Sequence, residues 1–199
     1  MQINESLVKK LIQEQFPQWQ DLPVQAVAQG GWDNYTFHLG TDMLVRLPRD
    51  AEHAPPILKE YQWLSVLTQK LSYTIPTPIA LGNPSEHYPW HWCINRWIEG
   101  EIASRQTIHD INYFAKDLGL FLKAFQFVDS KGGPEACADN FYRGGNLSAY
   151  DTEMQRALPQ IENAEQRNLA EQLWQSALSS EWENKPVCGF MAIWPLVIF

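Results

Sequence analysis

The chain has 199 residues, 45% of them hydrophobic and 19% charged, which is enough apolar sequence for a sizeable core in one domain or two small lobes. Its 15 Lys and Arg against 23 Asp and Glu give a net charge of -8, which argues against a nucleic-acid partner, because phosphate backbones are held by clustered cations, and favours a cationic small molecule. Three cysteines without Cys-x-x-Cys spacing imply neither a disulfide framework nor a zinc site, and a start without a basic, apolar leader predicts a cytoplasmic protein.

The first predicted element is a helix that begins after Asn4 and ends at Pro17. Asn4 can cap it, because a short polar side chain accepts a hydrogen bond from a free N–H of the first helical turn. Apolar residues at helical spacing predict one face packed on a sheet: Leu7, Val8, Leu11, Ile12 and Phe16. Behind Pro23, the segment from Val24 predicts a first strand.

The stretch 29–49 carries most of the chemical information. Gly30 and Gly31 allow a tight turn in which the backbone can come close to a ligand. Alternating apolar residues at 35–39 and 43–47, joined by Gly40-Thr41-Asp42, then predict a hairpin. The glycine pair fits a phosphate clamp, and a plain turn is the alternative.

Arg46 is a cation in the middle of an apolar strand, so its side chain must reach water or an anionic partner. A helix is predicted next, from Pro55 to about Thr68, because proline suits the first turn. Its apolar stripe consists of Ile57, Leu58, Tyr61, Leu64 and Leu67. Glu60 lies beside this stripe, and we predict an ion pair between Arg46 and Glu60; an ordinary solvated carboxylate is the alternative.

Further along, the proline-rich segment 75–84 predicts a short extended piece and a turn. A strand is predicted from Trp90 to Ile98, with Trp92, Ile94 and Ile98 on one buried face. Thr107 and Asp110 resemble a capping box ahead of an apolar helix that runs to about Phe125. Two more helices are predicted near 151–158, capped by Asp151, and near 169–178.

Three segments together resemble the aminoglycoside phosphotransferase family of protein-kinase-like small-molecule kinases: Gly30-Gly31-Trp32-Asp33-Asn34, Val45-Arg46-Leu47-Pro48 and Trp97-Ile98-Glu99-Gly100-Glu101. The similarity runs from about Val24 to Val187. It implies an α+β, protein-kinase-like fold, with an antiparallel-sheet N-lobe plus hinge over 1–98 and an incomplete helical C-lobe over 99–199 that ends in an aberrant tail.

The resemblance also implies a function: transfer of phosphate from ATP or GTP, with Mg²⁺, to a hydroxyl of an aminoglycoside, a macrolide or a similar small molecule. Carried over position by position, the nucleotide-binding residues are Gly30, Gly31, Asn34, Arg46, Glu60, Arg96 and Ile98. Main-chain groups of the last two would meet the adenine edge. Arg46 departs from the usual Lys, but it keeps the charge and adds a planar fork for phosphate oxygens.

Two alternatives stay open. One is a non-catalytic remnant that still binds nucleotide or another ligand. The other is an aromatic-rich carbohydrate-binding module, suggested by the nine tryptophans. Most of these tryptophans stand beside other apolar residues, which favours core packing.

Beyond Val187 the resemblance predicts His-Gly-Asp-x-x-x-x-Asn and a later Asp, which orient the acceptor and hold magnesium. The chain instead reads Cys188-Gly189-Phe190-Met191-Ala192-Ile193-Trp194-Pro195-Leu196-Val197-Ile198-Phe199. No catalytic or metal-binding residue is therefore assigned. This apolar run is too short to span a membrane, which takes roughly 20 residues.

The tail fits a shifted reading frame over the catalytic loop. If each codon is read from the third base of the old one, Met191-Ala192 must give Gly and Trp194-Pro195 must give Ala. Neighbouring codons permit His before that Gly, Asp after it, and Asn at the motif's spacing. We expect the gene to spell this motif in the shifted frame and to continue past codon 199 to a second metal-binding Asp; third bases that spell anything else would refute the shift.

Overall fold

The computed structural model describes residues 1–28, 31–129, 131–133, 136–137, 142 and 145–180. These residues belong to two compact units, one within 1–124 and one that begins at Phe125. Gly30 and the tail from Cys188 lie outside the described residues, so the predicted shift of frame at the tail has no structural counterpart here. The predicted lobe boundary at residue 98 stays a prediction.

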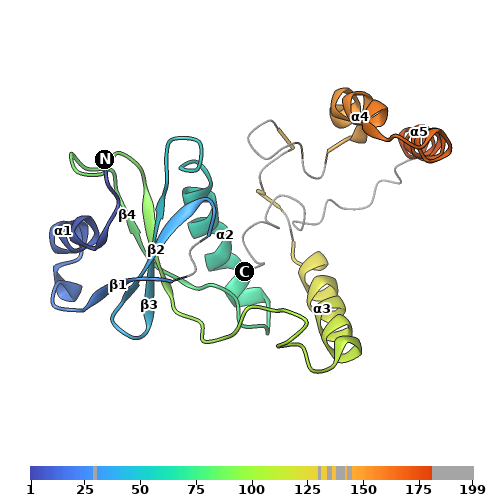
Figure 1. The fold of residues 1–199 in the computed structure, drawn as a ribbon. Helices are drawn as coiled ribbons and strands as arrows, with labels where there is room; N and C mark the ends of the chain where they lie inside the picture. Colours follow the sequence, from blue (N-terminus) through green and yellow to red (C-terminus); the bar gives the residue numbers. More distant parts are fainter. Residues whose placement is uncertain (29–30, 130, 134–135, 138–141, 143–144, 181–199) are drawn as a thin grey trace. The chain divides into compact units, whose positions relative to one another are not determined.

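The first unit is built on a five-stranded antiparallel sheet with the strand order β1-β2-β3-β5-β4 (Figure 1). Its elements are α1 (Glu5–Gln15), a short 3-10 helix η1 (Pro17–Trp19), β1 (Val24–Ala26), β2 (Asn34–Leu39), β3 (Met43–Pro48), α2 (Pro56–Lys70), β4 (Pro78–Gly82), β5 (Trp92–Arg96) and all but the last two residues of α3 (Ile111–Gln126). The second unit contains η3 (Leu147–Tyr150), α4 (Asp151–Ala157), η4 (Leu158–Gln160) and α5 (Ala164–Ser179). The predicted α+β class is confirmed.

Helix α1 forms as the sequence predicts. The Asn4 side-chain oxygen accepts a hydrogen bond from the Leu7 N–H at 3.0 Å. Val8, Leu11 and Ile12 are buried in a core that also contains sheet residues, because the apolar stripe of the helix lies on the sheet. The helix therefore covers one face of β1–β3.

The hairpin of β2 and β3 decides which side chains share a face. Gly40, at φ +65°, supplies the left-handed residue that the turn requires. Phe37 pairs with Val45, and both lie in the α1 core. Thr36 pairs with Arg46, so this pair points to the opposite face, where α2 lies (Figure 1).

Helix α2 differs from its predicted stripe at one position. Leu58 is exposed, whereas Trp63 is buried with Ile57, Leu64 and Leu67. Glu60 lies inside the buried stripe rather than beside it. This placement follows from its ion pair with the sheet, which lets a carboxylate occupy an otherwise apolar face.

Strand β5 is shorter than predicted and is buried on both faces. It ends at Arg96, and Ile98 is exposed rather than part of a buried face. Trp92 and Ile94 belong to the α1 core, while Cys93 and Asn95 lie on the α2 side. A central strand covered on both faces does not show the alternation that a half-buried strand shows.

Two predicted helix caps are wrong in detail. Asp110 itself accepts from the Asn112 and Tyr113 N–H groups, so no reciprocal capping box with Thr107 forms. Asp151 is the first residue of α4, and its carboxylate accepts from the Trp174 indole at 2.7 Å. The local sequence pattern could not predict this contact, because Trp174 is distant from Asp151 in sequence.

Gly82 lies against the buried Trp92, and an added Cβ would stand 2.0 Å from the indole Cε2. We expect Gly82→Ala to lower the free energy of unfolding by about 1–3 kcal/mol, because the ring has no room to move. Denaturant unfolding measures this change. Gly100→Ala is the matched control, since its Cβ would meet nothing within 4 Å, and it should change stability by less than about 0.5 kcal/mol. Equal effects of the two substitutions would contradict the expected clash.

Across the residues described, no helix combines the length and apolar character that crossing a membrane requires.

Candidate functional site

The predicted ion pair between β3 and α2 is confirmed. Arg46 Nη1 donates to Glu60 Oε2 at 2.5 Å. Only 14% and 8% of the two side chains are exposed, so the pair is largely removed from water. A cation from the sheet and an anion from the helix are therefore held together on the α2 face.

Burial and pairing act against each other in this site. Burial raises the pKa of Glu60, because the carboxylate loses its hydration, and the Arg46 guanidinium offsets part of that shift. Burial alone would lower the pKa of Arg46, but the neighbouring groups, Glu60 foremost, together outweigh it and raise the pKa. We assign the charged form to both groups near neutral pH, because a buried guanidinium stays protonated and needs a charged partner.

Cys93 lies opposite Arg46 in the β3–β5 register. Burial raises the pKa of its thiol to about 12, so the thiol is neutral at physiological pH. Cys93 therefore acts as a small buried side chain beside the ion pair and supplies no nucleophile.

The segment after β3 holds the glycine turn. Arg49 Nη2 donates to the Gly31 carbonyl at 3.2 Å, and the Arg49 N–H donates to the Asp33 carbonyl at 3.1 Å. The Arg49 guanidinium also lies 4.8 Å from the centre of the Tyr35 ring. These contacts fix Gly31 and Asp33 to the end of the strand that carries Arg46.

His53 adds a second connection to this turn. Its Nε2 lies 3.4 Å from Asp33 Oδ1, and its Nδ1 lies 2.7 Å from Asp50 Oδ1. The hydrogen bond from His53 lowers the pKa of Asp50. No local sequence pattern marks Arg49 or His53 as a site residue, because both make their contacts through loops.

The predicted hinge residues lie where β5 leaves the sheet. The Arg96 N–H donates to the Thr77 carbonyl at 2.8 Å, so this N–H is already engaged. Ile98 is exposed, and within the described part of the chain its N–H has no hydrogen-bond partner. An unpaired, exposed backbone N–H beyond the end of a strand is available to a ligand.

Two buried asparagines have a side-chain oxygen that finds no hydrogen-bond partner among the residues the structure describes. Asn34 begins β2, directly after the glycine turn, and Asn95 precedes Arg96 in β5. Asn34 was predicted as a site residue, whereas Asn95 was not. In the sequence, Asn95 could have been recognised as a polar residue that directly follows the apolar run Trp92-Cys93-Ile94.

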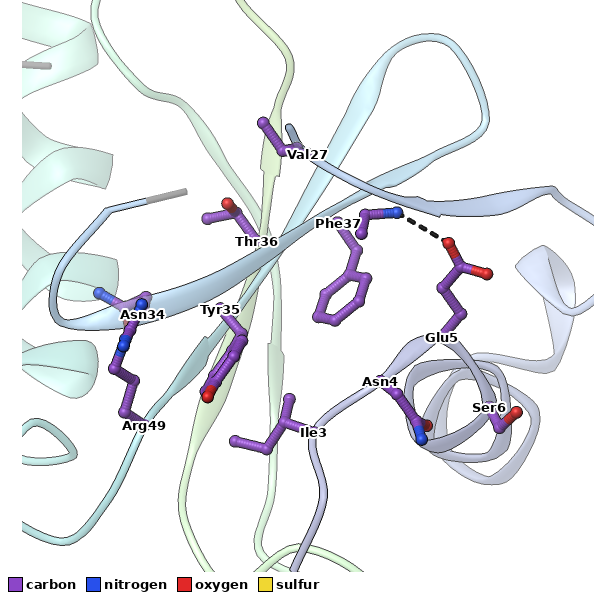
Figure 2. Close-up of a pocket in the computed structure, with 11 residues that line it drawn as sticks. Ile3, Asn4, Glu5, Ser6, Val27, Asn34, Tyr35, Thr36, Phe37 and Arg49 are labelled. Atoms are coloured by element: carbon purple, nitrogen blue, oxygen red, sulfur yellow. Dashed lines mark hydrogen bonds between the residues drawn. The ribbon is translucent and has the colours of Figure 1, made fainter. Parts of the chain in front are cut away.

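A cavity of about 600 Å³ lies elsewhere, between the N-terminal turn of α1 and strands β1 and β2 (Figure 2). Its wall includes Glu5, whose carboxylate accepts from the Ala26 N–H at 3.0 Å, and also Tyr35 and Arg49 (Figure 2). Neither member of the Arg46–Glu60 pair lines it, whereas the predicted site residue Asn34 does. We favour the ion-pair face as the functional site, because the buried Arg46–Glu60 pair lies on it, together with the Asn95 oxygen, which has no partner among the described residues.

Comparison with known proteins gives one family. Residues 24–188 match the sequence profile of the phosphotransferase enzyme family. No curated protein sequence matches the chain.

Solved structures with a similar fold include aminoglycoside 2'-phosphotransferase-IIIa in complex with GDP (TM-score 0.68, 19% identity, covering 87% of this chain and 59% of that chain). Others are the ternary complex of APH(2")-IIa with streptomycin and ATP (TM-score 0.56, 17% identity, 90% and 60%) and macrolide 2'-phosphotransferase type I (TM-score 0.56, 14% identity, 85% and 58%). The predicted kinase-like fold is confirmed, and the chain spans about 59% of the length of the first of these structures.

Proposed function

Because the chain belongs to the phosphotransferase enzyme family, we propose that its first unit binds a purine nucleoside triphosphate on the sheet face that carries Arg46. The observation that supports this most is the buried pair of Arg46 and Glu60 on consecutive elements. An isolated buried cation would be costly, so the carboxylate both stabilises the guanidinium and fixes its direction.

The phosphates would meet Arg46 and the turn at Gly30 and Gly31. A guanidinium offers several N–H donors in a plane, so Arg46 can keep its bond to Glu60 and direct others at phosphate oxygens. Glycine lets the backbone approach the phosphates closely, and Arg49 holds Gly31 in place. Asn34 follows this turn, and its unpaired oxygen is available to bond the loop or the ligand.

The purine edge would meet main-chain groups at Arg96 and Ile98. The free Ile98 N–H is a donor for a ring nitrogen, and it lies two residues beyond the end of β5. This assignment places the base near β5 and the phosphates near β3. A nucleotide would thus lie across adjacent strands of one sheet.

The residues named above do not identify the acceptor of the phosphoryl group. Structures similar to this chain hold kanamycin, streptomycin or gentamicin. We propose a hydroxyl of such an aminoglycoside, or of a macrolide, as the acceptor in the cytoplasm. The net charge of -8 suits a cationic aminoglycoside.

Magnesium would neutralise the phosphates in that reaction. In the described ranges, no three His, Cys, Asp or Glu side chains gather where they could hold a metal ion. We therefore assign the ion no ligand and no step here. Charge neutralisation by this chain's own described residues comes from Arg46.

A non-catalytic role is favoured by the sequence of the tail. The chain carries no His-Gly-Asp-x-x-x-x-Asn stretch in its own reading frame. We propose that the 199-residue chain binds nucleotide without transferring phosphate.

Calorimetric titration of the chain with ATP and with GTP, each with Mg²⁺, tests the proposed binding. We expect dissociation constants on the order of 1 μM to 1 mM, the usual range for enzyme substrates. Adenosine and guanosine are the matched controls, and they should bind at least about tenfold more weakly because they lack the phosphates. No heat of binding from either triphosphate at several millimolar would refute the proposal.

A further inference from the structure

His53, in the segment between β3 and α2, lies between two carboxylates. Its Nδ1 is 2.7 Å from Asp50 Oδ1, and its Nε2 is 3.4 Å from Asp33 Oδ1. Asp50 belongs to the same segment, and its Oδ1 also accepts from the Glu52 and His53 N–H groups, which anchors the ring on that side. Asp33 belongs to the glycine turn that precedes β2. His53 therefore connects this turn to the segment that leads into α2.

Both ring nitrogens of His53 are engaged. An imidazolium has an N–H on each nitrogen, so it can donate to both carboxylates at once. A ring that is engaged on both sides has no N–H left to offer a phosphate oxygen. Any effect of His53 on a bound nucleotide is therefore transmitted through Asp33 and the glycine turn.

The Asp33 carboxylate is close enough to the ion pair to act on both of its members. Burial is the main cause that raises the pKa of Glu60, and Asp33 adds to that shift. Burial would lower the pKa of Arg46, but Glu60 foremost, and Asp33 in smaller part, raise it. Arg46 is the cation proposed to meet the phosphates. A carboxylate in the turn beside it repels phosphate oxygens and competes with them for the guanidinium.

The contacts of His53 contribute little to stability. The exposed fractions of the side chains are 64% for Asp33, 53% for Asp50 and 34% for His53, so water and salt screen their charges. A nucleoside triphosphate carries several negative charges and displaces water from the turn, so the same carboxylate has a larger effect on a bound phosphate chain. The charge of Asp33 therefore matters more for binding than for folding.

We propose that His53 is a positioning residue for nucleotide binding, which holds the Asp33 carboxylate and offsets its charge so that phosphates meet Arg46 without a competing anion. The inference rests on the proposed nucleotide binding and adds a residue that touches no part of the nucleotide. Without His53, the Asp33 carboxylate keeps its full charge and is free to turn toward Arg46. The loss of affinity falls on the phosphates and spares the nucleoside.

A double-mutant cycle on His53 and Asp33 tests this role, with ATP binding measured by calorimetric titration in the presence of Mg²⁺. His53→Ala should weaken ATP binding about tenfold, as expected when a charge next to the phosphates is no longer offset. Asp33→Asn should bind ATP at least as tightly as the wild-type chain. His53→Ala with Asp33→Asn should bind within about twofold of Asp33→Asn alone, because no carboxylate remains to be offset.

Two controls separate this role from a structural one. His87→Ala removes another histidine that lies between two carboxylates, Glu14 and Glu86, outside the glycine turn, and it should keep ATP affinity within about twofold. Adenosine binding, followed by magnetic resonance at millimolar concentration, should change by less than about twofold in His53→Ala, because adenosine has no phosphates.

Folding is checked separately. The midpoint of thermal unfolding of His53→Ala should lie within about 4 °C of the wild-type value, because the lost contacts are exposed. His53→Gln keeps a polar side chain without a charge and should show the same loss of ATP affinity. It guards against an effect of the smaller alanine.

The outcomes separate the two proposals. Unchanged ATP affinity in His53→Ala, an equal loss for adenosine, or a tenfold loss that persists when Asp33→Asn is added would overturn the role of His53 and leave nucleotide binding intact. Absence of ATP and GTP binding by the wild-type chain would refute the proposed function itself, and the role of His53 with it.

Discussion

Replacing Arg46 with Met should lower the free energy of unfolding by about 3–5 kcal/mol, because it leaves the Glu60 carboxylate buried without its partner. Removing both charges, in Arg46→Met with Glu60→Leu, should restore most of that loss. Two apolar side chains of similar volume need no compensation for lost hydration, and such replacements of buried ion pairs are often neutral or stabilising. Denaturant unfolding of the single and double variants gives both values.

Nucleotide binding should respond differently to the same two variants. Both lack the guanidinium, so both should bind ATP and GTP at least about tenfold more weakly than the wild-type chain, although only the single variant is strongly destabilised. Arg105→Met is the control for charge alone, because Arg105 is an exposed arginine outside the proposed site. A double variant that is stable and retains its affinity within about twofold would show that Arg46 is structural and does not contact phosphate.

The second large effect concerns turnover. The purified 199-residue chain should form no phosphorylated product from ATP or GTP and any aminoglycoside or macrolide. Phosphoryl transfer depends on an Asp that orients the acceptor and on metal ligands that neutralise charge, and the chain's own reading frame carries no such motif after Val187. Mass spectrometry of long incubations is the sensitive readout.

A gene with one base restored ahead of codon 188 supplies the matched arm of this experiment. If the shifted-frame hypothesis holds, its product carries the catalytic loop and should show turnover. Product formation by the 199-residue chain that disappears in the stable Arg46 and Glu60 double variant would contradict the expected inactivity.

Local patterns in the sequence predicted the elements whose partners are close in the chain. The Asn4 cap, the hairpin turn at Gly40 and the direction of Arg46 all follow from short-range spacing. The ion pair was predictable because only one carboxylate stood on the helix after β3 at a position beside the apolar stripe. The pair joins β3 and α2, which are consecutive in sequence.

The remaining features depend on contacts between distant residues. The pairing of Leu44 with Asn95 joins strands that are separated by α2 and β4, so the position of Asn95 beside the ion pair could not be read from its neighbours. Ile98 was misplaced for the same reason, because β5 is covered on both faces and ends two residues earlier. The bond from Trp174 to Asp151 likewise crosses 23 positions of sequence.

Nuclear magnetic resonance of the ¹⁵N-labelled chain, titrated with ATP and Mg²⁺, locates the nucleotide most directly. Two sites are compared: the ion-pair face of the sheet with Arg46, together with the segment that follows β5, and the α1 cavity lined by residues 3–6. We predict that the largest amide shifts occur at Gly31, at 44–46 and at 95–98, with residues 3–6 unchanged. Shifts confined to residues 3–6 and 26–27, with Arg46 and Ile98 unmoved, would contradict nucleotide binding on the ion-pair face.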